Sequence, residues 1–371
     1  MIEKLRKNIL FRILTSVKTT VTCLGLLFIL TFWGTIDQVY HGLYHAQETF
    51  FHSWGFFGFG FLPFPGAQLV LWVLFVNLMC VAGTKFVFKR TNIGILVIHF
   101  GLLAYFVSAF VTLQCVKESN VMMLEGSAAN VSSAYHDWEL SLWRQEGDVK
   151  SVIAYDLAGA KPGKTFDFDA GLTASVQMYY GNTQAFRGVS STGQGQLNAS
   201  GIQAITELPL LAEPEKNMPG GIFRFEQDHA PLADVLLYAG ENVPASFKVA
   251  DKIYFVQLRR KRFSLPFLLK LVDFKMENHP NTAIARSYQS LVEISTGDLS
   301  REVLISMNRP LRYKDFTVYQ ASYSIDALGR EYSTLAVVKN VGRVLPYVAS
   351  LLTFAGLALH FILVGFSRKF R

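Results

Sequence analysis

Two stretches decide the fold, residues 92–110 (NIGILVIHFGLLAYFVSAF) and residues 344–366 (VLPYVASLLTFAGLALHFILVGF). Each lies in a run that is long and apolar enough to cross a membrane as a helix and that lacks Asp, Glu, Lys and Arg. Each nevertheless contains one histidine, His99 or His360. An ionisable side chain in hydrocarbon is disfavoured by roughly 3 kcal/mol, so these histidines indicate a cofactor, an ion path or a buried partner. The alternative for a single histidine is a core residue bonded to a neighbouring group, and Asn77 is a candidate partner for His99.

The sequence as a whole predicts a polytopic α-helical membrane protein. It has 371 residues, 51% of them hydrophobic, and a mean hydropathy of +0.27, which is too apolar for an ordinary soluble protein of this size. Four windows pass the length test for a spanning helix. We expect transmembrane helices at 18–36, 68–88, 92–114 and 344–366.

Basic residues set the expected orientation. They lie in the N-terminal segment, in the turn between the second and third spans, and after the last span, whereas none occurs from Thr19 to Thr84. The positive-inside rule therefore places both termini in the cytoplasm and the long segment 117–343 on the far side of the membrane. The net charge of +7 partly reflects this anchoring and gives no case for nucleic-acid binding. The basic residues that determine this orientation are Lys4, Arg6, Lys7, Arg12, Lys85, Lys89, Arg90, Arg368, Lys369 and Arg371.

The expected organisation follows from these spans and this orientation. Besides the four spans, the chain is divided into a cytoplasmic N-terminus (1–17), an extracytoplasmic aromatic loop (37–67), a cytoplasmic turn (89–91), a large extracytoplasmic domain (115–343) and a cytoplasmic tail (367–371).

The two histidines are expected at a matched depth. His99 lies nine residues after Arg90, and His360 lies eight residues before Arg368. At a rise of about 1.5 Å per residue, both imidazoles fall roughly 12–14 Å from the basic ends of their helices. That arrangement suits bis-imidazole ligation of one haem. Gly356, one turn before His360, could leave room for a flat macrocycle or allow close helix packing.

The large domain, residues 115–343, is expected to be mainly β. Alternating β-branched and aromatic runs are separated by Gly, Asn, Asp and Pro signals, and no cysteine occurs after Cys115 to form disulfides. The Gly- and Ser-rich stretch Gly181–Gly221 is expected to be a long loop. The basic run 259–262 is interpreted as a solvated turn, with an anion-steering patch as the alternative.

The first loop carries two further features. Residues 50–61, FFHSWGFFGFGF, hold seven aromatic residues and three glycines, which predicts an interfacial segment or one wall of a haem cleft. His41 and His45 have i, i+4 spacing, but no HExxH or CxxC accompanies them, so the sequence gives a zinc site little support. The sequence also lacks CxxCH, GxxxxGK[ST] and GxSxG, the motifs of c-type haem attachment, nucleotide hydrolysis and acyl transfer.

Several motifs together resemble the ResB family, the CcsB-type component of System II cytochrome c maturation. The shared layout is three N-terminal spans, one large exported domain and a final span. The motifs that carry the resemblance are FFHSWGFF (50–57), GILVIHFGLL (94–103), LEGS (124–127), SLPFLLKLVDFKMENHPNTA (264–283), SYQSLVEI (287–294) and ISMNRPLRYKDFTVYQASY (305–323). The likeness is weakest over residues 151–247.

The resemblance implies a role in haem export and delivery. Such proteins act with a ResC/CcsA-type subunit that presents haem to apocytochrome c, so haem b would be transient cargo and this chain a non-catalytic or co-catalytic subunit of a haem lyase. The partner's tryptophan-rich WGxxWxWD segment is absent from the sequence, and no catalytic residue is assigned. His99 matches the family's transmembrane haem ligand. The family attributes the opposing ligand to the partner, which leaves His360 as an open alternative.

Two other functions stay open from the residues alone. One is a membrane electron-transfer subunit in which His99 and His360 hold a permanent haem b. The other is a transporter-associated scaffold with structural histidines.

The orientation gives a first prediction. A cytoplasm-active reporter fused after Lys89 or Arg371 should be active, and one fused within residues 117–343 should be inactive, because the basic loops stay on the cytoplasmic side. Reporter activity from the large domain would overturn this orientation.

Overall fold

A computed structural model of the chain describes residues 9–85, 89–146, 149–187, 196–197, 201–282, 284–297 and 299–369. Lys4, Arg6, Lys7 and Arg371, on which part of the expected orientation depends, lie outside these ranges. The chain divides into two compact units, which are described one at a time. Unit 1 comprises Met1–Lys117, Arg312–Thr317 and Val338–Arg371, and unit 2 comprises Glu118–Leu311 and Val318–Val337.

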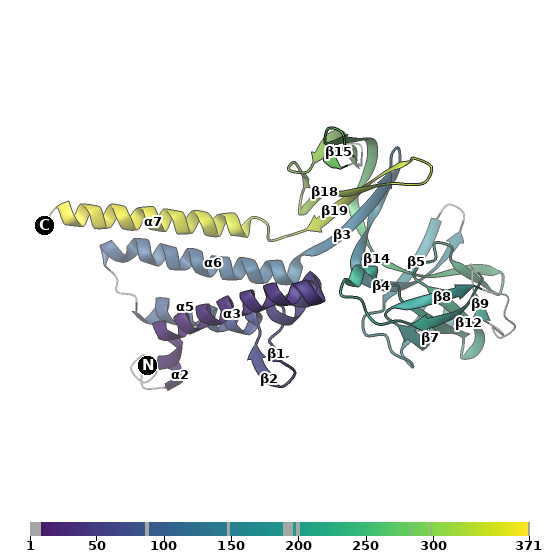
Figure 1. Ribbon diagram of the computed structural model, residues 1–371, viewed down its shortest axis with the longest axis horizontal. Coiled ribbons are helices and arrows are strands. Elements are labelled where there is room, and N and C mark those ends of the chain that lie inside the picture. The colour runs from purple at the N-terminus through teal and green to yellow at the C-terminus, as the bar shows by residue number, and fades with distance from the viewer. Residues whose placement is uncertain are drawn as a thin grey trace. The chain divides into compact units, whose positions relative to one another are not determined.

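Unit 1 is built from apolar helices (Figure 1). Four of the described helices are long and apolar enough to cross a membrane, and the expected class of four spanning helices with a large mainly β domain is confirmed. The third and fourth of these helices flank, in the chain, the segment 117–339, which contains most of the strands. The helices are α2 (Ile9–Leu14), α3 (Val17–His41), α4 (Leu43–Ala46), α5 (Ala67–Lys85), α6 (Ile93–Cys115) and α7 (Leu345–Lys369).

Helices α6 and α7 pack closely and antiparallel through glycines. A side chain at Gly94 would meet the backbone of His360, and one at Gly101 would meet Thr353. A Cβ at Gly356 would lie 2.7 Å from the backbone nitrogen of Ile98. Small residues let helix backbones approach in this way. Of the two roles suggested for Gly356, room for a macrocycle and close helix packing, the structure shows close packing.

Asn77 of α5 fills a gap in the backbone bonding between α2 and α3. Its side-chain nitrogen donates to the carbonyls of Leu14 (2.7 Å) and Ser16 (3.1 Å), and its oxygen accepts from the Thr20 hydroxyl (2.6 Å). The Leu14 carbonyl lies at the C-terminal end of α2, where carbonyls lack intrahelical partners, whereas the Ser16 carbonyl at the start of α3 also accepts from the backbone nitrogen of Thr19. The suggested pairing of Asn77 with His99 is therefore wrong.

The aromatic loop is more ordered than the sequence indicated. Helix α3 continues to His41, and after α4 a single π-helical turn, Gln47–Phe51, leads into a hairpin of β1 (Gly55–Gly58) and β2 (Leu62–Pro65). Trp33 of α3 anchors the hairpin, with ring centroids 5.1–5.5 Å from four phenylalanines. The tip is apolar and exposed, because Phe57, Phe59 and Phe61 each expose at least 70% of their surface. The four rings are Phe50, Phe56, Phe59 and Phe64.

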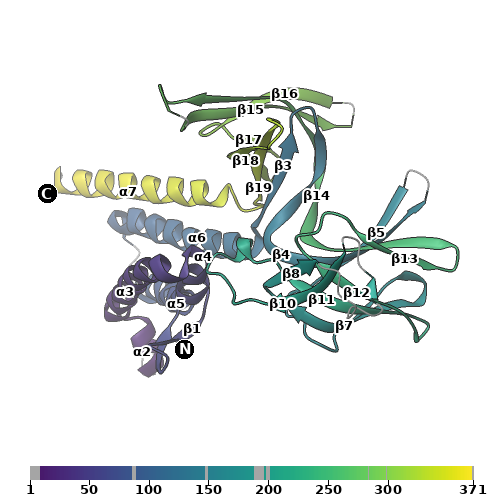
Figure 2. The ribbon, with the colours of Figure 1, turned by 45° about the vertical axis from the view of Figure 1, so that its right-hand side comes forward.

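Most of the strands belong to unit 2, and they form two larger sheets and a hairpin (Figure 2). The ten-stranded sheet includes β3 (Lys117–Leu124), β4 (Ala128–Glu146), β5 (Val149–Asp156), β13 (Ala245–Val249), β14 (Lys252–Asn278), β15 (Ala285–Thr296), β16 (Leu299–Ser306), β17 (Leu311–Tyr313), β18 (Phe316–Ile325) and β19 (Glu331–Lys339). The five-stranded sheet holds β6 (Thr165–Asp167), β7 (Leu172–Tyr180), β9 (Gln196–Leu197), β11 (Gly220–Gln227) and β12 (Ala230–Tyr238). The hairpin pairs β8 (Thr183–Arg187) with β10 (Ile202–Glu207).

The main core of unit 2 lies between these two sheets. Alternation along β11 turns Phe223 and Phe225 inward, both fully buried, while Arg224 between them pairs with Asp234 at 2.8 Å. The 27-residue strand β14 runs through the ten-stranded sheet and connects its neighbours at both ends. It pairs with β13 and β4 near its start and with β15 near its end. The prediction of a long loop at Gly181–Gly221 was only partly right, because strands β8, β9 and β10 lie within this range.

The basic run 259–262 is not a solvated turn. It lies inside β14, and Arg259 pairs with Glu139 of β4 at 2.8 Å, with only 10% and 7% of the two side chains exposed. The guanidinium of Arg260 stacks 3.9 Å from the ring centroid of Trp138, and its burial lowers the pKa of Arg260. Lys261 bonds Asp156 at 2.5 Å, and that hydrogen bond raises the pKa of Lys261. The run was misread because charge alone does not reveal partners on a neighbouring strand.

The glycine contacts of α7 give a second prediction. Gly356→Ala should lower the free energy of unfolding by about 1–3 kcal/mol, because the new methyl group must push α6 and α7 apart. Gly365→Ala on the same helix should be neutral or slightly stabilising, since a Cβ there meets nothing within 4 Å. Thermal unfolding of the two detergent-solubilised variants measures the difference, and equal stability would contradict the packing described.

Candidate functional site

His99 lies on α6 with one ring nitrogen already engaged. Its Nδ1 lies 2.7 Å from the carbonyl oxygen of Ile95, one turn earlier on the helix. A carbonyl can only accept, so Nδ1 carries the proton and donates. The lone pair is then on Nε2, which is the form of imidazole that binds iron.

The helix face that carries His99 also faces α5. Residues seven positions apart lie on one side of a helix, so His99 shares a face with Phe106. The ring centroid of Phe106 lies 5.8 Å from that of Phe75, and Phe110 lies 5.2 Å from Trp72, both partners being on α5. An open apolar cavity of about 380 Å³ is lined by these rings. On α6 the cavity is lined by residues from Tyr105 onward, six or more positions after His99.

His360 lies in a different setting. Its backbone packs on Gly94, and Ile98 packs on Gly356, so the antiparallel register places His99 five residues from the position opposite His360. Five residues correspond to about 7.5 Å along the helix, so the two Cα atoms lie at different levels of the α6–α7 pair. Nδ1 of His360 is buried and has no hydrogen-bond partner among the described residues, so no bond selects its tautomer.

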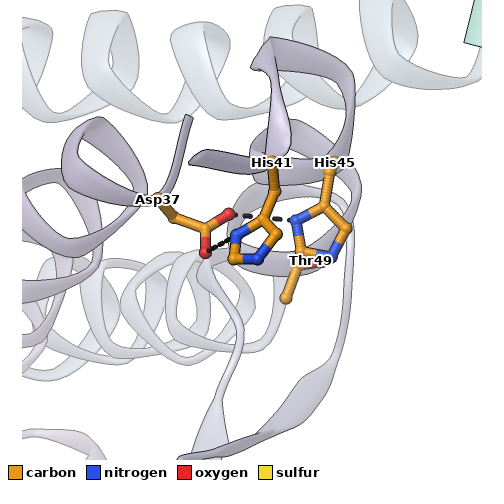
Figure 3. A network of polar contacts seen from close by, with 4 residues as sticks. All are labelled: Asp37, His41, His45 and Thr49. Atoms are coloured by element: carbon orange, nitrogen blue, oxygen red, sulfur yellow. Dashed lines mark hydrogen bonds and ion pairs between the residues drawn. The ribbon is translucent and has the colours of Figure 1, made fainter. Parts of the chain in front are cut away.

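A second histidine cluster lies at the end of α3 (Figure 3). Asp37 contacts both His41 and His45, at 2.8 and 2.9 Å from their Nδ1 atoms. The sequence showed the spacing of the two histidines, but Asp37 was missed. The signal was present, because Asp37, His41 and His45 follow one another at intervals of four.

In unit 2, Tyr179 of β7 has a raised pKa that follows from its packing. Burial, assisted by the charge of Asp156, raises the pKa of Tyr179 to about 12. The phenol therefore stays protonated at neutral pH and is no candidate base.

The fold and these sites define a class, a four-span membrane protein with a large β domain between the third and fourth spans. Within that class, the ResB-like family model matches residues 218–330, from just before β11 to the turn before β19. This match covers the motifs at 264–283, 287–294 and 305–323, and it supports a ResB/CcsB-type protein, which suggests involvement in cytochrome c biogenesis. The matched segment includes neither His99 nor His360. No curated protein matches the chain.

Proposed function

We propose that this chain is the membrane subunit of a System II cytochrome c synthase that takes part in haem export and delivery, together with a ResC/CcsA-type partner. The cargo is haem b, which the complex passes to apocytochrome c for covalent attachment. The proposal places the protein in a bacterial cytoplasmic membrane with both termini inside and the β domain outside.

One observation supports this function most, the hydrogen bond that orients His99. Because Nδ1 donates to Ile95, a neutral ring keeps its Nε2 lone pair available without any rearrangement. A second contact that fixes the ring is typical of histidines that bind metals. We assign His99 as an axial ligand of the haem iron during transfer.

The opposing ligand is assigned to the partner subunit. His360 is displaced by about 7.5 Å along the α6–α7 pair and faces Gly94, whereas His99 lies on the side that faces α5. Two axial ligands must lie on opposite sides of one iron atom, which this register does not favour. His360 remains the alternative ligand within the chain.

The chemistry of attachment is assigned to the partner. In the family, the tryptophan-rich external segment belongs to that subunit, and this sequence lacks it. The present chain then supplies a haem ligand and an apolar helix bundle, and its β domain holds the assembly together or docks the apocytochrome. It is a co-catalytic subunit with no catalytic residue of its own.

Ligation by His99 gives a third prediction. In the complex, His99→Ala should lower co-purifying haem and abolish cytochrome c assembly, while protein levels stay near normal because removal of a polar group from the bundle costs little stability. Added imidazole should partly restore assembly by occupying the vacated coordination position. Haem content and assembled cytochrome are the measurements.

His360→Ala is the matched companion variant. If the partner supplies the second ligand, this variant keeps most of the activity and an unchanged haem spectrum. If it reproduces both the haem loss and the imidazole rescue of His99→Ala, the ligands are an intrachain pair. Normal assembly by His99→Ala would remove the haem-site assignment.

Dependence on the partner gives a fourth prediction. The chain expressed alone should fail to attach haem to a co-expressed apocytochrome, and co-expression with the tryptophan-rich subunit should restore attachment. Haem staining of the cytochrome after denaturing electrophoresis measures covalent attachment. Attachment by the chain alone would show that the reaction site lies here.

A further inference from the structure

The cluster at the end of α3 places three metal-binding groups around one point. Asp37 Oδ1 lies 2.8 Å from Nδ1 of His41, and Asp37 Oδ2 lies 2.9 Å from Nδ1 of His45. An ionised carboxylate only accepts hydrogen bonds, so both nitrogens donate to it in the metal-free protein. Figure 3 shows the two rings side by side with the carboxylate beside them, and their centroids are 5.0 Å apart. The three ligand atoms lie within 4.8 Å of one another.

A break in the helix makes this convergence possible. In an uninterrupted helix Asp37 and His45 would be separated by about 12 Å along the axis, too far for direct contact. Helix α3 ends at His41, and Gly42 adopts a φ of 83°, a backbone conformation that glycine reaches at little cost. The chain turns there, and α4 brings His45 back to the carboxylate.

We propose that Asp37, His41 and His45 bind a divalent transition-metal ion of the class that prefers imidazole, such as Zn²⁺. Ligand atoms about 2.0–2.2 Å from one zinc ion, the usual Zn–N and Zn–O distances, lie roughly 3.4 Å apart in a tetrahedral site. The observed nitrogen–oxygen separations of 2.8 and 2.9 Å are shorter than this, so the donor atoms need to move apart only slightly to hold an ion. The ion takes the place of the two protons on Nδ1, and in each neutral ring that proton moves to Nε2.

The surroundings of His45 suit this binding mode. Nε2 of His45 lies 3.4 Å from the hydroxyl oxygen of Thr49, which can accept a hydrogen bond from Nε2 once the ring's proton is there. Histidines that bind metals generally donate their second nitrogen to such a partner, which holds the ring in place. The fourth and later positions are open to water, because 60% of His41 and 50% of His45 are exposed whereas Asp37 is only 13% exposed.

The neighbouring pair of His52 and Glu48 is an ordinary histidine–carboxylate contact and serves as a comparison. His52 bonds Glu48 at 2.8 Å, also at i, i+4 spacing and also exposed, but this pair has one imidazole and one carboxylate. The Asp37 cluster differs because one carboxylate joins two imidazoles. Two nitrogen ligands also disfavour Ca²⁺ and Mg²⁺, which prefer oxygen.

The test is zinc binding by the full-length, haem-free protein in detergent. After equilibrium dialysis against Zn²⁺ and removal of free metal, elemental analysis should find one ion per chain in the wild type. The double variant His41→Gln/His45→Gln and the single variant Asp37→Asn should bind at least roughly tenfold more weakly. His52→Gln is the matched control and should bind as the wild type does, and excess Ca²⁺ should not compete.

Two results would overturn the site. One is equal zinc retention by the wild type and the double histidine variant, whether both retain the ion or neither does. The other is an equal loss of zinc in His52→Gln. Because His99 and His360 are untouched, this outcome is independent of the haem proposal.

Discussion

A polar group among the apolar helices is costly unless it has a partner inside the protein, and this constraint shapes unit 1. Lipid offers no hydrogen bonds, so an unsatisfied donor or acceptor among spanning helices is costly. The Asn77 side chain donates hydrogen bonds to the carbonyls of Leu14 and Ser16, and the carbonyl of Ile95 accepts one from Nδ1 of His99. The bond to His99 has a chemical consequence, because it leaves the lone pair on Nε2, where iron can bind.

The same helices show how packing limits the choice of ligands. Glycines at positions 94, 101 and 356 let α6 and α7 approach until backbone meets backbone. Such contacts are set by hard atomic radii and leave little freedom to slide. The register that they impose separates His99 from His360 by about 7.5 Å along the helices, and this separation is why the second iron ligand is sought in another subunit.

The fold class was predictable because its signals are local. Span lengths follow from uninterrupted apolar runs, and the strands of the β domain follow from alternation of residue types. Long-range register was not predictable in this way. Distances from Arg90 and Arg368 suggested one depth for both histidines, but the depth of a residue depends on how two helices slide against each other, and glycine contacts decide that.

The other misreadings also concern partners that are distant in the sequence. Arg259 looked solvated because its buried partner Glu139 lies 120 residues earlier, on a neighbouring strand. Asp37 was overlooked because a standard helix would keep it away from His45, and only the turn at Gly42 brings them together. A lone histidine motif is therefore weak evidence for a site until the third group is placed.

The proposed function depends on ligation of the haem iron by Nε2 of His99, and replacing the ligand atom tests that bond. The measurement is the absorption and electron paramagnetic resonance spectrum of haem co-purifying with the His99→Cys variant and its partner. A cysteine at this position offers sulfur in place of nitrogen, so we expect spectra of thiolate-ligated iron. Haem at the wild-type content with an unchanged wild-type spectrum would contradict it.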